Sequence, residues 1–177
     1  MSKASLKKEL ATFNAEQLRE IILDLYNARK EAKEYLEFFI NPDIEKLNDK
    51  TTEALKKEIG RVKRRMVSPR WTRVNAILKN YDTLRPGPEH VIKIYWTAVK
   101  LAAVEMSLYY VSATFETGLM KLFTKTIEYG DKNQVLATIF PEILKYIDDA
   151  SVSPNKTFRY IGSCFKRTIE TYRPKMK

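Results

Sequence analysis

The sequence predicts an all-α protein, a bundle of about seven to eight helices packed as successive hairpins. Apolar residues recur at intervals of three and four, the period of an amphipathic helix, and no segment alternates cleanly enough to predict a strand. Only five glycines occur in 177 residues. The expected connections are short, which favours antiparallel neighbours. We therefore expect a single domain over residues 1–177, and residues 85–88 (Arg-Pro-Gly-Pro) are the best candidate for a boundary inside it.

The N-terminal part is expected to begin with a short helix over residues 5–12. Asn14 then fits the N-cap of a second helix, with Gln17 three residues later as its capping-box partner. An apolar stripe continues to Phe39, and the helix should end before Pro42, because proline disfavours helical conformation in the residue that precedes it.

A third helix is expected from about residue 43 to 66, with Val62 and Met66 facing the core. Ser68 and Pro69 resemble a cap followed by a proline in the first turn of a fourth helix. That helix would place Trp71 on its apolar stripe.

The fifth expected helix, residues 89–113, is apolar nearly all round, which is typical of a helix at the centre of a bundle. We therefore expect residues 92–111 to be the most buried segment, with Leu108 in the core. Three further helices are expected, over residues 119–129, 133–147 (split or kinked by Pro141) and 155–172.

The net charge is +10, and two segments hold the basic residues. Nine basic residues and one acid lie between Lys56 and Lys79, and seven basic residues and one acid between Lys156 and Lys177. Such clusters can neutralise phosphates, which supply most of the non-specific affinity for nucleic acid. The candidate polyanion-binding residues are Lys57, Arg61, Arg64, Arg65, Arg70 and Arg73 in the first segment and Arg159, Lys166 and Arg173 in the second.

The first basic segment can be interpreted in two ways. Arg61, Arg64 and Arg65 would project from one side of the third helix, and an exposed Trp71 could stack on a base. Alternatively, the arginines form an ordinary solvated face and Trp71 belongs to the core.

Few residues are available for catalysis or metal binding. The chain has one histidine, His90, and one cysteine, Cys164, too few for histidine-based triads and most zinc sites. No glycine-rich phosphate loop of the common spacings occurs. Glu105 lies within the apolar fifth helix, where burial would raise its pKa unless it is paired, and Glu116 could share its face. A structural carboxylate explains Glu105 as well as a general acid does, so we expect no enzymatic activity, cofactor or metal.

Compartment and membrane association can also be predicted. A single cysteine cannot form an intrachain disulfide, which fits a reducing compartment. The first ten residues lack the apolar core of a signal peptide. Lys100 and Glu105 interrupt the most apolar stretch, which argues against a membrane-spanning helix. We expect a cytoplasmic protein that is not associated with a membrane.

Several segments resemble a known family. Residues 6–10 (Leu-Lys-Lys-Glu-Leu), residues 33–43 (ending in Asn-Pro-Asp) and residues 128–131 (Glu-Tyr-Gly-Asp) are similar to a family of uncharacterised bacterial helical proteins, a domain of unknown function. The resemblance spans roughly residues 5–150. It implies a bacterial, cytoplasmic, all-α protein and transfers no catalytic residue.

Three functions therefore remain open at the level of the sequence. The charge distribution favours a helical module that contacts nucleic acid or another polyanion. A protein–protein adaptor or assembly subunit would be favoured if much of the aromatic material were exposed, and an enzyme is the least supported. The aromatic residues in question are Tyr109, Tyr110, Phe115, Phe123, Tyr129 and Phe140.

Overall fold

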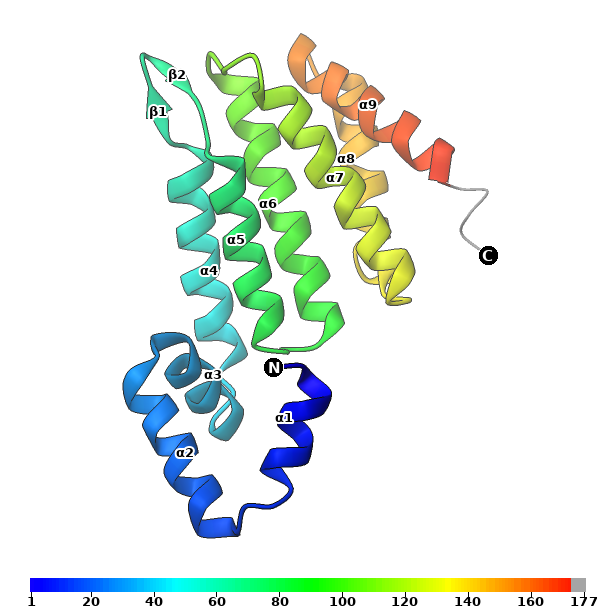
Figure 1. The fold of residues 1–177 in the computed structure, drawn as a ribbon. Helices are drawn as coiled ribbons and strands as arrows, with labels where there is room; N and C mark the ends of the chain where they lie inside the picture. The colour runs from blue at the N-terminus through cyan, green and yellow to red at the C-terminus, as the bar shows by residue number, and fades with distance from the viewer. Residues whose placement is uncertain (173–177) are drawn as a thin grey trace. The chain divides into compact units, whose positions relative to one another are not determined.

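The structure, a computed structural model, describes residues 1–172 and confirms the all-α fold (Figure 1). Helices make up 78% of it, and the described residues form nine α-helices and one two-stranded sheet. The additional helix arises because the segment expected to form one helix over residues 14–40 divides at Arg29. There the backbone is extended (φ −135°, ψ 118°), which interrupts the helical hydrogen bonding.

The chain divides into two compact units, of which the first is Met1–Asp43. It contains α1 (Lys3–Leu10), α2 (Ala15–Ala28) and α3 (Lys30–Ile40). The predicted capping box is confirmed: Asn14 Oδ1 accepts from the Gln17 backbone N–H and Gln17 Oε1 accepts from the Asn14 backbone N–H, each at 2.9 Å. No residue of this unit is buried.

The second unit begins at Ile44 and is organised around one central helix. Its α6 contacts α4, α5, α7 and α9 (Figure 1). Residues 85–88 cover most of the connection between α5 and α6 and the first residue of α6, all inside this unit, and the single-domain interpretation of the whole chain stays a prediction. The elements are α4 (Ile44–Ile59), β1 (Val62–Lys63), β2 (Met66–Val67), α5 (Trp71–Thr83), α6 (Pro88–Leu108), α7 (Phe115–Lys132), the 3-10 turn η1 (Leu136–Thr138), α8 (Phe140–Val152) and α9 (Lys156–Tyr172).

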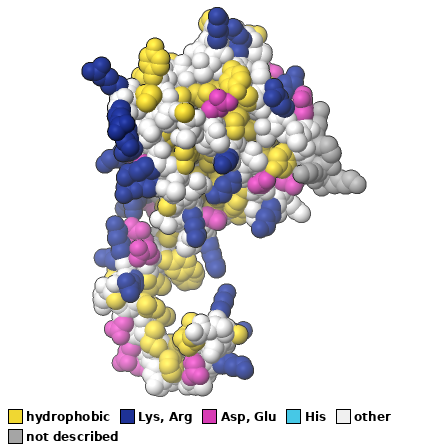
Figure 2. Space-filling view, turned by 45° about the horizontal axis from the view of Figure 1, so that its top comes forward, with side chains coloured by type: hydrophobic (Ala, Val, Ile, Leu, Met, Phe, Trp, Pro, Cys, Tyr) yellow, Lys and Arg dark blue, Asp and Glu magenta, His cyan; other side chains and the backbone are white. Residues whose placement is uncertain are grey.

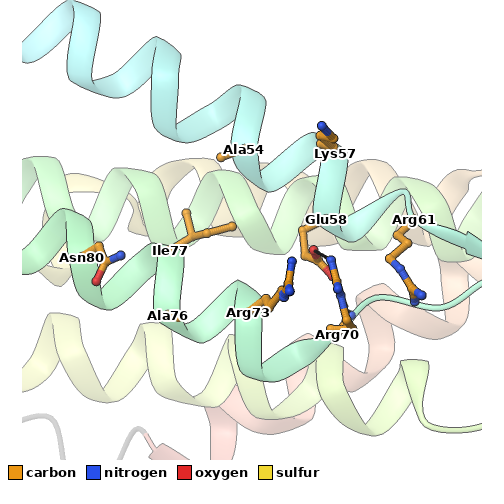
Figure 3. A pocket seen from close by; sticks show the side chains of 9 residues that line it. All are labelled: Ala54, Lys57, Glu58, Arg61, Arg70, Arg73, Ala76, Ile77 and Asn80. Carbon is orange, nitrogen blue, oxygen red and sulfur yellow. Dashed lines mark hydrogen bonds and ion pairs between the residues drawn. The ribbon is translucent and has the colours of Figure 1, made fainter. Parts of the chain in front are cut away.

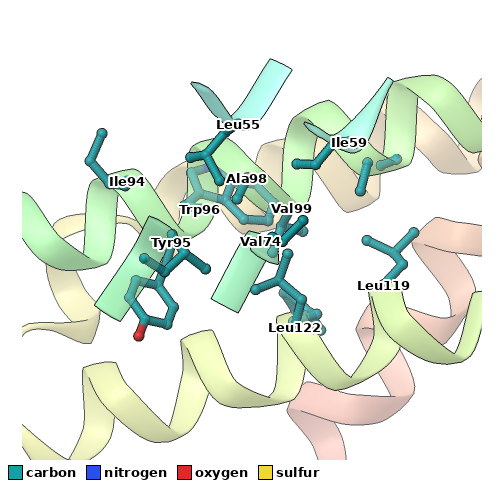
Figure 4. Packing of buried hydrophobic residues seen from close by; sticks show 14 of the residues in the cluster. Leu55, Ile59, Val74, Ile94, Tyr95, Trp96, Ala98, Val99, Leu119 and Leu122 are labelled. Carbon is teal, nitrogen blue, oxygen red and sulfur yellow. The ribbon is translucent and has the colours of Figure 1, made fainter. Parts of the chain in front are cut away.

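The core is built around α6, as Figure 4 shows. Ile92 and Val99 of α6 are fully buried, with Leu55 of α4, Val74 of α5 and Leu119 of α7 packed around them. The first four turns of α6 thus form the predicted centre of the bundle.

The expected extent of the central helix was wrong at its C-terminal end. The helix ends at Leu108, whose side chain is 63% exposed, and not at residue 113. The chain turns into extended conformation at Tyr109 (φ −130°, ψ 161°) and then runs beside β2. Leu108 is therefore a surface residue and not a core residue.

The region between α4 and α5 also differs from the expectation. The third helix ends at Ile59 beside Gly60, a residue that commonly follows the last turn of a helix, and β1 and β2 form an antiparallel hairpin in place of its last two turns. Val62 and Met66 are 64% and 41% exposed, so neither points into the core.

Smaller differences concern helix termini. The segment expected to form a helix over residues 133–147 is split at Pro141, as one of the two expected outcomes, because η1 precedes α8 and Pro141 lies in the first turn of α8, where its missing N–H costs nothing. The N-cap of α5 is Arg70, two residues after the expected Ser68. At the start of α9, Asn155 Oδ1 accepts from the Phe158 backbone N–H at 3.0 Å.

Candidate functional site

A hollow of about 590 Å³ between α4 and α5 brings together four of the predicted polyanion-binding residues (Figure 3). In Figure 3 Glu58 and Arg70 lie against each other, with Arg73 on one side and Arg61 on the other. The residues that line it are Ala54, Lys57, Glu58, Arg61, Arg70, Arg73, Ala76, Ile77 and Asn80.

Arg70 is occupied by an ion pair with Glu58. Its Nε donates to Glu58 Oε1 at 2.8 Å, its Nη2 donates to Oε2 at 2.6 Å, and its backbone N–H donates to Oε1 at 3.0 Å. The Glu58 side chain is only 10% exposed, against 41% for Arg70. These hydrogen bonds from Arg70 lower the pKa of Glu58 despite its burial, and Arg73 adds a smaller electrostatic contribution. The pair fixes the start of α5 against the end of α4.

Arg61 connects the hollow to the hairpin. Its backbone carbonyl accepts from the Ser68 N–H at 2.8 Å, and its Nη1 donates to the Ser68 carbonyl at 3.0 Å. These two bonds close the base of the hairpin. They involve no carboxylate, so no acid offsets the charge of this guanidinium through either bond.

Lys57 and Arg73 are the remaining cations of the hollow. Both are exposed, and neither side chain makes a hydrogen bond or ion pair within the described part of the chain. Four cationic side chains and one carboxylate give the hollow a formal charge of +3.

Arg64 and Arg65 extend this charge along the hairpin. The register pairs Val62 with Val67 and Lys63 with Met66, so the two arginines form a two-residue turn. Both have positive φ (51° and 66°), which defines a type I′ turn. Both are exposed and have no partner among residues 1–172.

These arginines do not project from a helix as the sequence suggested, but they remain continuous with the hollow through Arg61. Figure 2 shows Lys and Arg side chains gathered along the upper left edge of the molecule, the side on which Figure 1 places α4 and the hairpin. We call Lys57, Arg61, Arg64, Arg65 and Arg73 the basic surface.

The second predicted basic cluster does not join this surface. Arg159 is half-buried, and its Nη1 donates to the Ser153 carbonyl, which holds the turn between α8 and α9. Lys166 is exposed on α9, and Arg173 lies outside the described residues. In Figure 1, α9 and the hairpin lie on opposite sides of α6. Arg159 therefore has a structural role.

Trp71 belongs to the core and is not an exposed stacking surface. It packs edge to face on Phe115, with ring centroids 5.6 Å apart. It also lies over Gly118 of α7, where an added Cβ would come within 2.0 Å of the indole Cε2. The neighbouring Arg70 and Arg73 are therefore exposed, whereas the Trp71 ring packs against the core.

Two adjacent exposed aromatic residues lie directly after α6. Tyr109 and Tyr110 are 59% and 86% exposed, whereas Phe115 and Phe123 are buried. Tyr129 and Phe140 are partly buried. The sequence did not predict that Tyr109 and Tyr110 lie in an exposed extended segment, because the apolar run was assigned to a helix. The β-favouring Tyr-Tyr-Val run at 109–111 was the available signal.

The backbone after α6 is held against the hairpin. The Tyr110 carbonyl accepts from the Val67 N–H at 2.8 Å, and the Ser112 N–H donates to the Val67 carbonyl at 2.9 Å. Val111 and Val67 form a parallel bridge. The exposed tyrosines are thus fixed beside β2.

The two carboxylates considered for catalysis are not on one helix. Glu105 lies in the last turn of α6 and Glu116 in the first turn of α7, where it accepts from the Tyr160 hydroxyl. Partial burial raises the pKa of Glu105, whose carboxylate accepts no hydrogen bond within residues 1–172. His90 and Cys164 are half-buried and lie on α6 and α9. In residues 1–172, no group of three or more His, Cys, Asp or Glu side chains could hold a metal ion.

The fold and the site together define an all-α protein with one concentrated basic surface, formed by a hollow between two helices and the hairpin that joins them. The chain belongs to the family described as "Family of unknown function (DUF6155)", which it matches over residues 1–171. The resemblance to a domain of unknown function is thereby confirmed. Comparisons with curated proteins and with solved structures found no match. None of the helices in the described chain has the length and apolar character needed to span a membrane.

Proposed function

We propose that this protein is a non-enzymatic binding protein that contacts nucleic acid or another polyanion through the basic surface. The observation that supports this proposal is the excess of cationic side chains over carboxylates in the hollow. Glu58 is the only acid that lines it, and Arg70 already occupies both carboxylate oxygens. The side chains of the five cations of the basic surface form no ion pair or hydrogen bond with a carboxylate in the described part of the chain.

The physical argument is electrostatic. Like charges held close together repel one another, and a bound anion relieves that repulsion. Four of the five cations are arginines, whose planar guanidinium matches phosphate geometry and is weakly hydrated. Phosphate groups spaced along a chain are therefore the expected ligand.

The salt dependence of binding tests this proposal. If the five side chains each neutralise one phosphate, the log–log slope of affinity against salt concentration should be about −4.5 on duplex DNA and about −3.5 on a single strand. Fluorescence anisotropy of labelled oligonucleotides between about 50 and 200 mM salt would measure it.

Lys166→Ala combined with Arg167→Ala is the matched control. It removes two exposed cations from α9, away from the basic surface, and should leave the slope unchanged. Absence of any retention at about 50 mM salt, where counterion release is most favourable, would contradict the proposal.

A protein partner is the second candidate function, favoured by the exposure of Leu108, Tyr109 and Tyr110. Aromatic residues are enriched in protein interfaces. Recovery of the protein from lysate with and without nuclease separates the two functions. Nucleic acid in the untreated sample supports the first, and a stoichiometric protein that resists nuclease supports the second.

We also propose a cytoplasmic location in a bacterial cell. The absence of a second cysteine supports a reducing compartment. The bacterial origin rests on the resemblance described above. Fractionation of the source cells would test the location.

A further inference from the structure

The turn of the hairpin carries residues that its geometry disfavours. A type I′ turn requires positive φ at both central positions, and Asn-Gly is the preferred pair there. This chain has Arg64 and Arg65 at those positions, with φ of 51° and 66°. A side chain with a Cβ is strained in the left-handed region, and strained residues cluster at functional sites. The pair therefore indicates that the hairpin presents charge at a cost to its own stability.

Tyr110 is anchored through its backbone to β2, the strand that follows the two arginines. Its carbonyl accepts from the Val67 N–H of β2, and the Ser112 N–H donates to the carbonyl of the same Val67. The Tyr110 side chain is nevertheless 86% exposed. Val67 is two residues from Arg65, which is about 7 Å along a strand. A ring on a fixed backbone has little motion to lose on binding, because tyrosine has only two rotatable side-chain bonds.

The residues next to Tyr110 in the chain and in the neighbouring strand are apolar or aromatic. Leu108 and Tyr109 precede Tyr110 in the chain, and Met66 precedes Val67, the residue bridged to Val111. All three are exposed. Exposed apolar side chains beside paired arginines suit a ligand that has both flat apolar faces and negative charges.

Single-stranded nucleic acid presents both flat apolar faces and negative charges on its accessible surface. Its unpaired bases offer flat faces to aromatic side chains, and its phosphates require cations. In a duplex the base faces are stacked on one another and are out of reach of a side chain. We infer that the basic surface binds single-stranded nucleic acid, with Tyr110 stacking on one base and Arg64 and Arg65 holding phosphates beside it. The inference rests on the proposed function and specifies its ligand.

The test compares a labelled single strand of about a dozen nucleotides with a duplex of the same length, on the full chain. Stacking of one base contributes about 1–3 kcal/mol, equivalent to a 5- to 150-fold change in affinity. Tyr110→Ala should therefore weaken single-strand binding by about 5- to 150-fold and duplex binding by less than about twofold. Tyr110→Phe keeps the ring and should bind within about twofold of the wild type.

Tyr160→Phe and Tyr160→Ala are the matched controls. Tyr160 is an exposed tyrosine on α9, and its substitution should leave single-strand affinity unchanged. Thermal melts of all variants exclude unfolding as a cause.

The contribution of Arg64 and Arg65 to binding is tested by a double variant whose residues favour the type I′ turn. Arg64→Asn combined with Arg65→Gly places the preferred type I′ pair in the turn, so the hairpin is retained while two charges are lost. The salt slope on a single strand should then flatten by about 1.4 units. An unchanged slope would show that the turn does not contact phosphate.

A spectroscopic probe reports the stacking directly. The native tryptophans, Trp71 and Trp96, lie in the interior, so Tyr110→Trp adds an exposed indole beside the hairpin. Addition of the single strand should quench its fluorescence, and addition of the duplex should not. Binding without quenching would overturn the stacking.

The remaining outcomes separate the two proposals. Salt-dependent binding that Tyr110→Ala does not weaken overturns the single-strand inference and leaves the proposed function standing. Absence of binding to either oligonucleotide overturns the single-strand inference and excludes nucleic acid as the ligand of the basic surface. Binding to vesicles of anionic lipid, with no oligonucleotide binding, has the same consequence and assigns the surface to a membrane, a polyanion of another class.

Discussion

At the scale of single residues, one buried carboxylate decides which cations of the first basic segment can bind a ligand. Glu58 is 8% exposed and accepts three hydrogen bonds, all from Arg70. Removing Arg70 would leave a buried charge without its partner, which is far more costly than losing an exposed ion pair. Arg70 is therefore a structural residue, although it lies among candidates for binding.

Arg70→Ala should lower thermal stability and change its pH dependence. Because Arg70 holds the pKa of folded Glu58 below its ordinary value of 4.5, the pair stabilises the fold above about pH 4.5. That stabilisation is lost as the pH falls through the lowered pKa. Thermal melts of wild type and Arg70→Ala should therefore differ most near neutral pH and converge in acid.

Arg73→Ala is the control for this measurement. Arg73 lies in the same hollow but donates no hydrogen bond to Glu58. Its removal should leave the melting temperature almost unchanged. If Arg70→Ala is as stable as Arg73→Ala at pH 7, the ion pair does not hold α4 and α5 together.

At the scale of elements, α6 changes character along its length. Its first four turns are buried on nearly every side, whereas Val104 and Leu108 are 51% and 63% exposed. The chain then leaves the bundle and pairs with β2. One apolar run therefore supplies both the centre of the core and the exposed tyrosines beside the hairpin.

Alanine substitutions along α6 should reveal this division. Ile92→Ala should cost about 2–5 kcal/mol, the usual range for truncating a fully buried aliphatic side chain. Leu108→Ala should cost less than about 1 kcal/mol, because its side chain is mostly solvated. Urea unfolding with a common m-value measures both. Equal losses at the two positions would contradict the exposure of Leu108.

At the scale of the whole molecule, burial is confined to one of the two compact units. Every buried hydrophobic residue of the described chain lies between Leu55 and Ile169. Residues 1–43 form three amphipathic helices without a buried side chain. Folding stability should therefore reside in the unit that begins at Ile44, which also carries the basic surface.

A fragment of residues 44–177 should fold without the first unit. It keeps the complete buried core, and a unit with its own core can fold by itself. Circular dichroism should show a helical spectrum and a cooperative melt for this fragment. A fragment that is unfolded at room temperature would show that residues 1–43 complete the core.

The sequence by itself determined the helical class, because a period of three and four in apolar residues is compatible with little else. It also determined the capping box at Asn14 and Gln17, whose signal is local. The basic residues between Lys57 and Arg73 were identified as a candidate site from charge density alone. Each of these features depends on residues close together in the chain.

The tertiary structure decided what those residues do. Glu58 and Arg70 are twelve residues apart, and their pairing depends on how α4 and α5 pack. The hairpin replaced the expected helical turns because Val67 found a partner in residues 110–112, more than forty positions away. Local periodicity contains no information on such pairing, since hydrogen bonds between distant segments form only once the helices have packed. The separation of Arg159 from the basic surface has the same origin.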